Sequence, residues 1–256
     1  MTSWKNNNVL TSRRFVEEVL NPAVGPKKPG KIVARNKEHL RGLIEARIKE
    51  FGPNCDLNDI DVSQITDMSG LFKYSNFNGD ISQWDVSNVI DMSHMFHGSK
   101  FNGDISNWDV SNTKDMSWMF ANSEFNDNIS NWDVSNVEGM NYMFFGSEFD
   151  RDISNWNVSN VKNMNWMFGS SKFNGDISQW DVSSVKTMSH MFKGSYFDRD
   201  ISNWNVSNVE DMSHMFEGSE FGGDISDWDV SNVRNMAWMF KDSPLEEYEP
   251  SWYDYY

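Results

Sequence analysis

Tryptophan recurs every 24 residues through most of this 256-residue chain. The residues at this spacing are Trp84, Trp108, Trp132, Trp156, Trp180, Trp204 and Trp228, and Trp252 stands one further period on. The other large apolar residues repeat with them. A fixed period of this length is typical of a solenoid, in which each coil buries its inner side chains only by stacking on its neighbours. The chain is therefore predicted to be a repeat solenoid.

The repeat divides the chain into four parts. Eight coils of 24 residues occupy 57–248. Before them, 31–56 is predicted to be a capping strand and helix, the helix starting at Asn36 and ending at Gly52. Residues 1–30 are predicted to hold a short helix and a linker rich in Pro and Gly. Residues 249–256 begin a ninth coil, so they are expected either to close the rod or to form a free aromatic tail.

Within each coil, two spacings predict local structure. In the fifth coil, Trp156 and Val158 at positions four and six alternate as on one face of a short strand. Met164, Met167 and Phe168 at positions twelve, fifteen and sixteen share one face of a helical turn. Each coil is thus expected to contain a strand followed by a helical turn.

The repeat also resembles a known family. Ile, Trp and Val at positions one, four and six mirror the first half of a leucine-rich repeat. The full motif, as in Ile81 to Asp104, resembles the BspA-like leucine-rich-repeat surface proteins, in the Trp- and Met-rich subfamily described as a domain of unknown function. The resemblance implies a right-handed, leucine-rich-repeat-like β/α solenoid over 57–248, protein binding, and a cell-surface or secreted location. It implies no catalytic residues.

Charge is distributed unevenly along the chain. Residues 1–56 hold 11 Lys and Arg against 6 Asp and Glu, whereas 57–256 hold 11 against 32. The body is thus expected to repel nucleic acid and to favour a protein partner with basic character. Because the start lacks a signal-peptide pattern and no 18-residue apolar run occurs, we expect no membrane insertion and a cytoplasmic location, with the surface location as the alternative.

Position fourteen is the first candidate binding surface. On a helical turn it would lie opposite the core and expose a row of rings, which is typical of an interface. The row is His94, Trp118, Tyr142, Trp166, His190, His214 and Trp238. The alternatives are that the rings only stack on one another, or that a non-helical turn tucks them inward. His190 and His214 lack further ligands in this row, so no metal site is predicted.

Aspartates form further columns. Position five holds Asp85, Asp109, Asp133, Asp181 and Asp229 and is expected to face outward on the concave side as a recognition surface. Position twenty-four holds Asp80, Asp104, Asp152, Asp176, Asp200 and Asp224. There, aspartates can accept backbone N–H bonds in turns, bind calcium between coils, or attract a basic partner. The asparagines at position eight are interpreted as structural.

Repeated rows without a singular constellation argue against an enzyme and require no cofactor. The sequence favours a non-catalytic protein–protein recognition scaffold that binds through the aromatic row, the acidic face, or both. Two alternatives stay open. One is an acidic charge mimic that inhibits a nucleic-acid-binding protein; the other is a calcium- or glycan-dependent adhesin.

Overall fold

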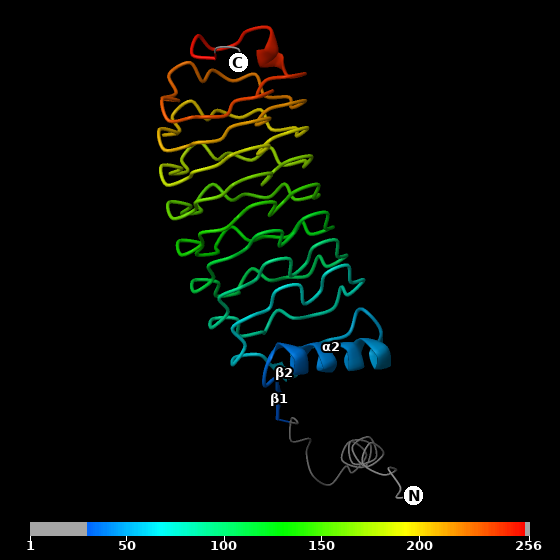
Figure 1. Ribbon diagram of the computed structural model, residues 1–256. Helices are drawn as coiled ribbons and strands as arrows, with labels where there is room; N and C mark the ends of the chain where they lie inside the picture. Colours follow the sequence, from blue (N-terminus) through cyan, green and yellow to red (C-terminus); the bar gives the residue numbers. More distant parts are fainter. Residues whose placement is uncertain (1–29, 254–256) are drawn as a thin grey trace, which may run out of the picture. The chain divides into compact units, whose positions relative to one another are not determined.

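The computed structural model describes residues 30–253. The short helix predicted before the linker lies outside this range, as does nearly all of the linker. Strand β1 (Ile32–Val33) pairs with β2 (Ile60–Asp61) in a two-stranded sheet. Helix α2 (Lys37–Phe51) lies between them in sequence, and a 3-10 helix, η1 (Pro244–Glu246), comes near the C-terminal end. In Figure 1 the coils after α2 stack one upon another as far as η1.

Helix α2 begins and ends where its sequence indicates. The side chain of Asn36 accepts a hydrogen bond from the backbone N–H of His39 at 2.8 Å, which satisfies one of the free donors of the first turn. Gly52 ends the helix with a φ of 87°, a left-handed conformation that favours glycine. Leu40 and Ile44 are buried, whereas Phe51, the last residue of the helix, is 57% exposed.

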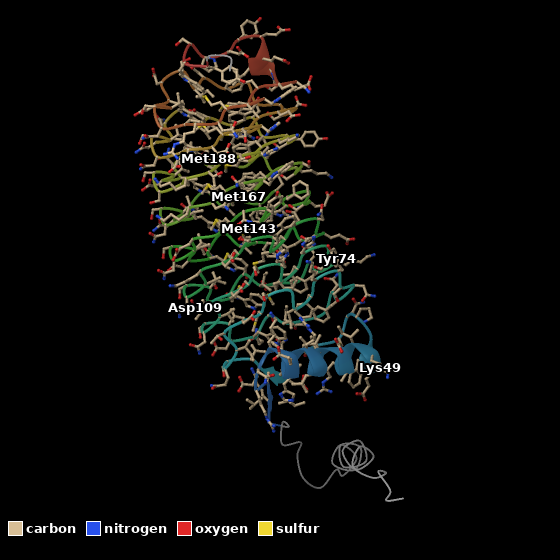
Figure 2. All side chains as sticks on the ribbon, in the orientation of Figure 1. Lys49, Tyr74, Asp109, Met143, Met167 and Met188 are labelled. Carbon is tan, nitrogen blue, oxygen red and sulfur yellow. The ribbon has the colours of Figure 1, made fainter. Side chains whose placement is uncertain are left out.

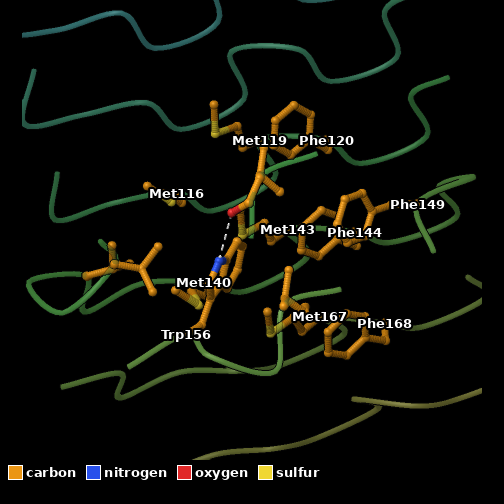
Figure 3. Close-up of a cluster of buried hydrophobic side chains, with 14 of the residues drawn as sticks. Met116, Met119, Phe120, Met140, Met143, Phe144, Phe149, Trp156, Met167 and Phe168 are labelled. Atoms are coloured by element: carbon orange, nitrogen blue, oxygen red, sulfur yellow. Dashed lines mark hydrogen bonds between the residues drawn. The ribbon is translucent and has the colours of Figure 1, made fainter. Parts of the chain in front are cut away.

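The coils bury the apolar positions that the repeat predicts. Three pairs of tryptophan rings from successive coils stack in parallel at 6.5 Å between centroids, namely Trp84–Trp108, Trp132–Trp156 and Trp156–Trp180. The indole Nε1 of Trp156 donates to the carbonyl of Ile129 in the preceding coil at 3.1 Å, and Figure 3 shows this bond within the methionine and phenylalanine core. The same bond recurs at each tryptophan of the column as far as Trp252, whose partner is Ile225. Each coil is therefore fixed to its neighbour both by stacked rings and by a buried hydrogen bond.

The helical turn predicted at positions twelve to sixteen is wrong. In the fifth coil, the N–H groups of Met164, Trp166 and Phe168 leave the coil and donate to carbonyls of the next one, at 2.9–3.0 Å. Trp166 and Ser170 adopt left-handed φ angles of 57° and 53°. A helix would turn those N–H groups back onto its own carbonyls. Bonding between coils replaces the helix while keeping the same side chains buried.

The strand predicted at positions four to six is also largely absent. Within the described part of the chain, only the first coil has a strand there, namely β2. Parallel bridges join the coils at position eleven instead, from Asp67↔Asp91 to Asp211↔Asn235. The regular secondary structure expected of a β/α coil is thus replaced by a run of turns, although the repeat solenoid itself is present.

The C-terminal segment lies over the last coil. Phe240 of that coil contacts the rings of Trp252 and Tyr253, with centroids 6.1 and 4.8 Å away. Because Trp252 also repeats the indole hydrogen bond of the spine, residues up to Tyr253 cover part of the last core layer.

Candidate recognition surfaces

The rings at position fourteen form a continuous stack, which we call the aromatic stripe. It runs from His94 to Trp238 through the seven residues predicted from the sequence. Successive centroids lie 3.9–6.4 Å apart, and the ring planes differ by at most 17°. The closest pair is Trp118 and Tyr142, at 3.9 Å. The structure therefore brings the whole predicted row together.

The stripe is less exposed than a helical turn would make it. Six of its rings are partly buried, and only Trp238, at the end of the stack, is exposed, at 54%. The non-helical turn lays each ring along the rod, so that Trp166 lies against Gly169, where an added Cβ would meet its Cε3 at 2.7 Å. Neighbouring rings cover the flat faces within the stack, which leaves mainly ring edges for a partner.

Every residue of the stripe has a left-handed backbone. Their φ angles lie between 57° and 62°, and in the first coil Gly70 occupies this position with a similar angle. Such a conformation costs a residue with a Cβ roughly 1–2 kcal/mol. The bulky rings therefore stand where glycine would be least strained.

Position seventeen adds residues to this surface that the sequence analysis missed. His97 faces His94 with Nδ1 atoms 3.3 Å apart, and both imidazoles stack on Trp118. Lys241 Nζ lies 4.2 Å from the ring centroid of Trp238, a cation–π contact. Position seventeen follows position fourteen by three residues, just as position fifteen follows position twelve. This spacing could have indicated that the columns at positions fourteen and seventeen are neighbours.

A charged cluster lies beside the stripe in the sixth and seventh coils. Glu217 pairs with Lys193 at 2.8 Å and with the imidazole of His214. Burial alone would raise the pKa of Glu217, but the hydrogen bonds from Lys193 and His214 outweigh it and lower that pKa. The carboxylate thus stays charged and holds both partners in place.

His190 is the most strongly perturbed histidine of the stripe. Its ring stacks on His214 at 4.4 Å, and its Nδ1 lies 2.6 Å from the hydroxyl of Ser189. Burial, together with His214 and Lys193, lowers the pKa of His190 to about 4, whereas Glu217 and Asp211 oppose the shift. The folded protein therefore keeps this imidazole neutral well below the ordinary pKa.

We expect this histidine to make folding stability depend on pH between about 6.5 and 4. In that window the unfolded chain binds a proton that the folded His190 does not, so stability falls as the pH falls. A shift of this size corresponds to about 3 kcal/mol at most, and less because the ring keeps some contact with water. Between pH 7 and pH 4.5, denaturant titrations should show a smaller loss of unfolding free energy for His190→Asn than for the unmutated protein. Asparagine is chosen because it tolerates the left-handed backbone. An equal loss in both proteins would contradict the assignment.

The aspartates of position five form a second surface, the acidic column. Asp85, Asp109, Asp133, Asp181 and Asp229 are all exposed. Each accepts a hydrogen bond from the backbone N–H of the serine two residues later, as Asp133 does from Ser135 at 3.0 Å. Hydrogen bonds from the following serine lower the pKa of Asp133, Asp181 and Asp229. In Figure 2, Asp109 and Tyr74, whose ring contacts His97, lie toward opposite edges of the rod.

Position twenty-four uses its aspartates in the same way. Asp104, for example, accepts from both the N–H and the hydroxyl of Ser106, at 2.9 and 2.7 Å. These bonds lower its pKa. Among residues 30–253, no three His, Cys, Asp or Glu side chains are grouped so as to hold a metal ion. The hydrogen bonds from the serines fit the turn-capping interpretation of this column.

The asparagines of position eight have a structural role. The side-chain amide of Asn160 donates to the carbonyl of Ser135 in the preceding coil at 2.7 Å, and the bond recurs along the column. These amides tie one corner of each coil to the next.

The fold and its surfaces define a repeat solenoid with a periodic aromatic core. The chain matches the family described as "Mycoplasma protein of unknown function, DUF285" over residues 43–148, 121–197 and 146–252, and it belongs to this family. Neither the curated proteins nor the solved structures that were compared contain a match. In the part of the chain that the structure describes, no helix has the length and apolar character needed to cross a membrane.

Proposed function

We propose that this protein is a non-catalytic protein–protein recognition scaffold that binds its partner through the aromatic stripe. The observation that supports the proposal is the unbroken row of seven rings, held in register by left-handed backbone from the second coil to the eighth. Aromatic side chains are enriched at the centres of interfaces. A rod of this kind offers a partner an aromatic ring at a fixed interval.

The left-handed backbone of the stripe bears on its role. It costs roughly 1–2 kcal/mol for each residue with a Cβ. Stacking is worth about 0.5–1.5 kcal/mol for each pair of rings, beyond the surface that the rings bury. Ring stacking by itself therefore only offsets the strain, and glycine, as at Gly70, would avoid that strain. We infer that the rings are also present for what their exposed edges contact.

The proposal predicts that Trp118→Asn, Trp166→Asn and Trp238→Asn, combined in one protein, abolish partner capture without unfolding the rod. Asparagine suits the left-handed backbone, so the triple variant removes three rings without adding strain. Capture by immobilised protein, followed by identification of what is retained, measures the first effect. Thermal unfolding measures the second. A folded triple variant that retains the same partner would contradict the proposal, and an unfolded one would make the stripe part of the core.

The matched control removes charge instead of rings. Position five already carries asparagine at Asn157 and Asn205, and Asn157 makes the same hydrogen bonds to Ser159 as the aspartates make to their serines. Asp109→Asn, Asp133→Asn and Asp181→Asn together should therefore preserve the fold. We expect partner capture to persist in this variant if the stripe is the main contact.

The control also tests the second candidate function, an acidic charge mimic that inhibits a nucleic-acid-binding protein. The exposed acidic column favours it, because its carboxylates are held in register and three of them have lowered pKa values. For a mimic, the three Asp→Asn changes should weaken capture, and affinity should fall steeply with salt. Capture indifferent to salt would discard this candidate.

We also propose, from the Ile, Trp and Val pattern, that the repeat is related to the BspA-like leucine-rich-repeat surface proteins. A cell-surface or secreted location would follow from that relationship, and a cytoplasmic one is the alternative. Adhesion through glycans is less favoured, because a sugar stacks on the flat face of a ring and the faces within the stripe are covered by neighbouring rings.

A further inference from the structure

The last coil leaves part of its apolar layer uncovered. Val230, Val233 and Met236 are only partly buried. The matched residues of the preceding coil are Val206, Val209 and Met212, which are at most 1% exposed. The C-terminal segment covers the other half of the layer, where Trp252 and Tyr253 pack on Phe240 and the hydroxyl of Tyr253 donates to the carbonyl of Met236 at 3.3 Å. We call the part left uncovered the open end; it is formed by Val230, Val233, Trp238 and the half-buried Met236 at its border.

Backbone hydrogen bonding is incomplete at the same place. In the preceding coil, the N–H groups of Met212 and His214 donate to the carbonyls of Asn235 and Ala237, both at 2.9 Å. In the last coil, the backbone N–H of Asp242 donates to the side-chain carboxylate of Glu246 at 2.8 Å. Met236 and Trp238, which correspond to Met212 and His214, have no acceptor within residues 30–253. Two backbone donors therefore lie unpaired beside an apolar surface.

The periodicity defines what would complete this edge. At position ten, the N–H of each coil donates to the carbonyl of the coil before it, as Arg234 does to Glu210 at 2.8 Å. A segment continuing the rod would therefore run parallel to the last coil. It would offer one N–H to the carbonyl of Arg234 and two carbonyls to Met236 and Trp238. Apolar side chains three residues apart would cover Val233 and Met236.

We propose that the open end is a docking site for an extended segment of another polypeptide, which adds to the rod as a parallel strand does to a sheet edge. The segment repeats the coil-to-coil interface found along the rod. This site is separate from the body of the aromatic stripe and shares only Trp238 with it, so it does not depend on the function proposed for the stripe.

A second copy of this chain does not fit the open end. Each last coil exposes two donors, the N–H groups of Met236 and Trp238, but one acceptor, the carbonyl of Arg234, so two last coils meeting end to end would leave a donor unpaired on each. The first coil of a second copy does not fit either, because α2 lies across that end of the rod (Figure 1) and its Lys37 bonds to the side chains of Asp67 and Ser69, the residues whose carbonyls would be needed. The partner segment therefore belongs to a different protein.

Amide hydrogen exchange on the full chain tests the proposal. The probe is a synthetic peptide with the sequence of 206–216, which carries the Val-x-x-Met spacing of an interior coil; a scrambled peptide is the control. Without peptide, the amides of Met236 and Trp238 should exchange at least about tenfold faster than those of Met212 and His214, which are hydrogen-bonded. An excess of the probe should slow Met236 and Trp238 by a similar factor and leave the other two unchanged.

Substitutions in the full chain identify where the probe peptide binds. Val233→Asp should abolish the protection by the probe, whereas Ser231→Asp, at an exposed neighbouring residue, should preserve it. The double variant Trp118→Asn and Trp166→Asn should leave the protection by the probe intact. This variant therefore distinguishes a failure of the function proposed for the stripe from a failure of the docking site at the open end. Absence of protection, protection by the scrambled peptide, or protection that survives Val233→Asp would overturn the proposal. Protection that rises with protein concentration without any peptide would overturn it in favour of a second copy.

Discussion

Replacing Trp156 by alanine is expected to lower the free energy of unfolding by about 3–5 kcal/mol, the range found when a large buried aromatic side chain is removed. The indole is 3% exposed and stacks between Trp132 and Trp180, at 6.5 Å from each. Its loss opens a cavity in the middle of the rod and leaves the carbonyl of Ile129 without its indole donor. Denaturant unfolding followed by circular dichroism measures the change.

The matched control is Trp252→Ala at the end of the same column. Trp252 makes the same bond, to Ile225 at 3.1 Å, but it is only partly buried and no coil among the described residues lies beyond it. We expect a loss of about 1–2 kcal/mol there, because less surface is buried and the site can relax. Equal losses at both residues would mean that stacking on two neighbours does not stabilise the indole column.

Gly79→Ala is expected to cost about 3 kcal/mol or more, although it adds a single methyl group. A Cβ at Gly79 would lie 1.9 Å from the carbonyl oxygen of Cys55 and 2.7 Å from Cε2 of Phe77. The first contact is with backbone, and that carbonyl also accepts the N–H of Asp80 at 3.2 Å. The joint between the first coil and its N-terminal cap must move to admit the methyl group, as in other overpacked cores. Thermal and denaturant unfolding would measure the cost.

Gly175 provides the comparison, because it occupies the same position in a later coil. The three heavy atoms nearest to its added Cβ all belong to the ring of Phe173, the closest at 2.8 Å. Three other coils carry Asp127, Arg151 and Arg199 at this position, so the repeat accommodates a side chain there. We expect Gly175→Ala to cost about 1 kcal/mol or less. Similar costs for the two alanine variants would show that the Cys55 carbonyl is not the obstacle.

Much of the core could be predicted from the sequence, because the position of an apolar residue in the 24-residue repeat is enough to indicate that it is buried. The residues expected inside the coils, such as Val158, Met164 and Phe168, are buried in the structure. The indole column was also predictable, since a solenoid with a constant period places equivalent residues above one another. The cap of α2 followed from Asn36 and Gly52, whose roles depend on their immediate neighbours.

The backbone path and the exposure of the stripe could not be predicted in the same way. Apolar residues at i, i+3 and i+4 fit a helical turn, but they also fit the run of turns that the structure contains. The choice between them depends on where the N–H of Trp166 finds its acceptor, and that acceptor is the carbonyl of Ser189 in the next coil. The position of the rings, and the contact of His97 with Trp118, follow from that choice.

By itself, the sequence determined the period, the buried positions and the residues that share each column, because these depend only on spacing along the chain. Only the tertiary structure decided the left-handed backbone, the covered ring faces and the open end. The reason is physical: many backbone donors and acceptors in this rod are satisfied between coils, and whether a neighbouring coil is present at a given edge is a property of the assembled structure.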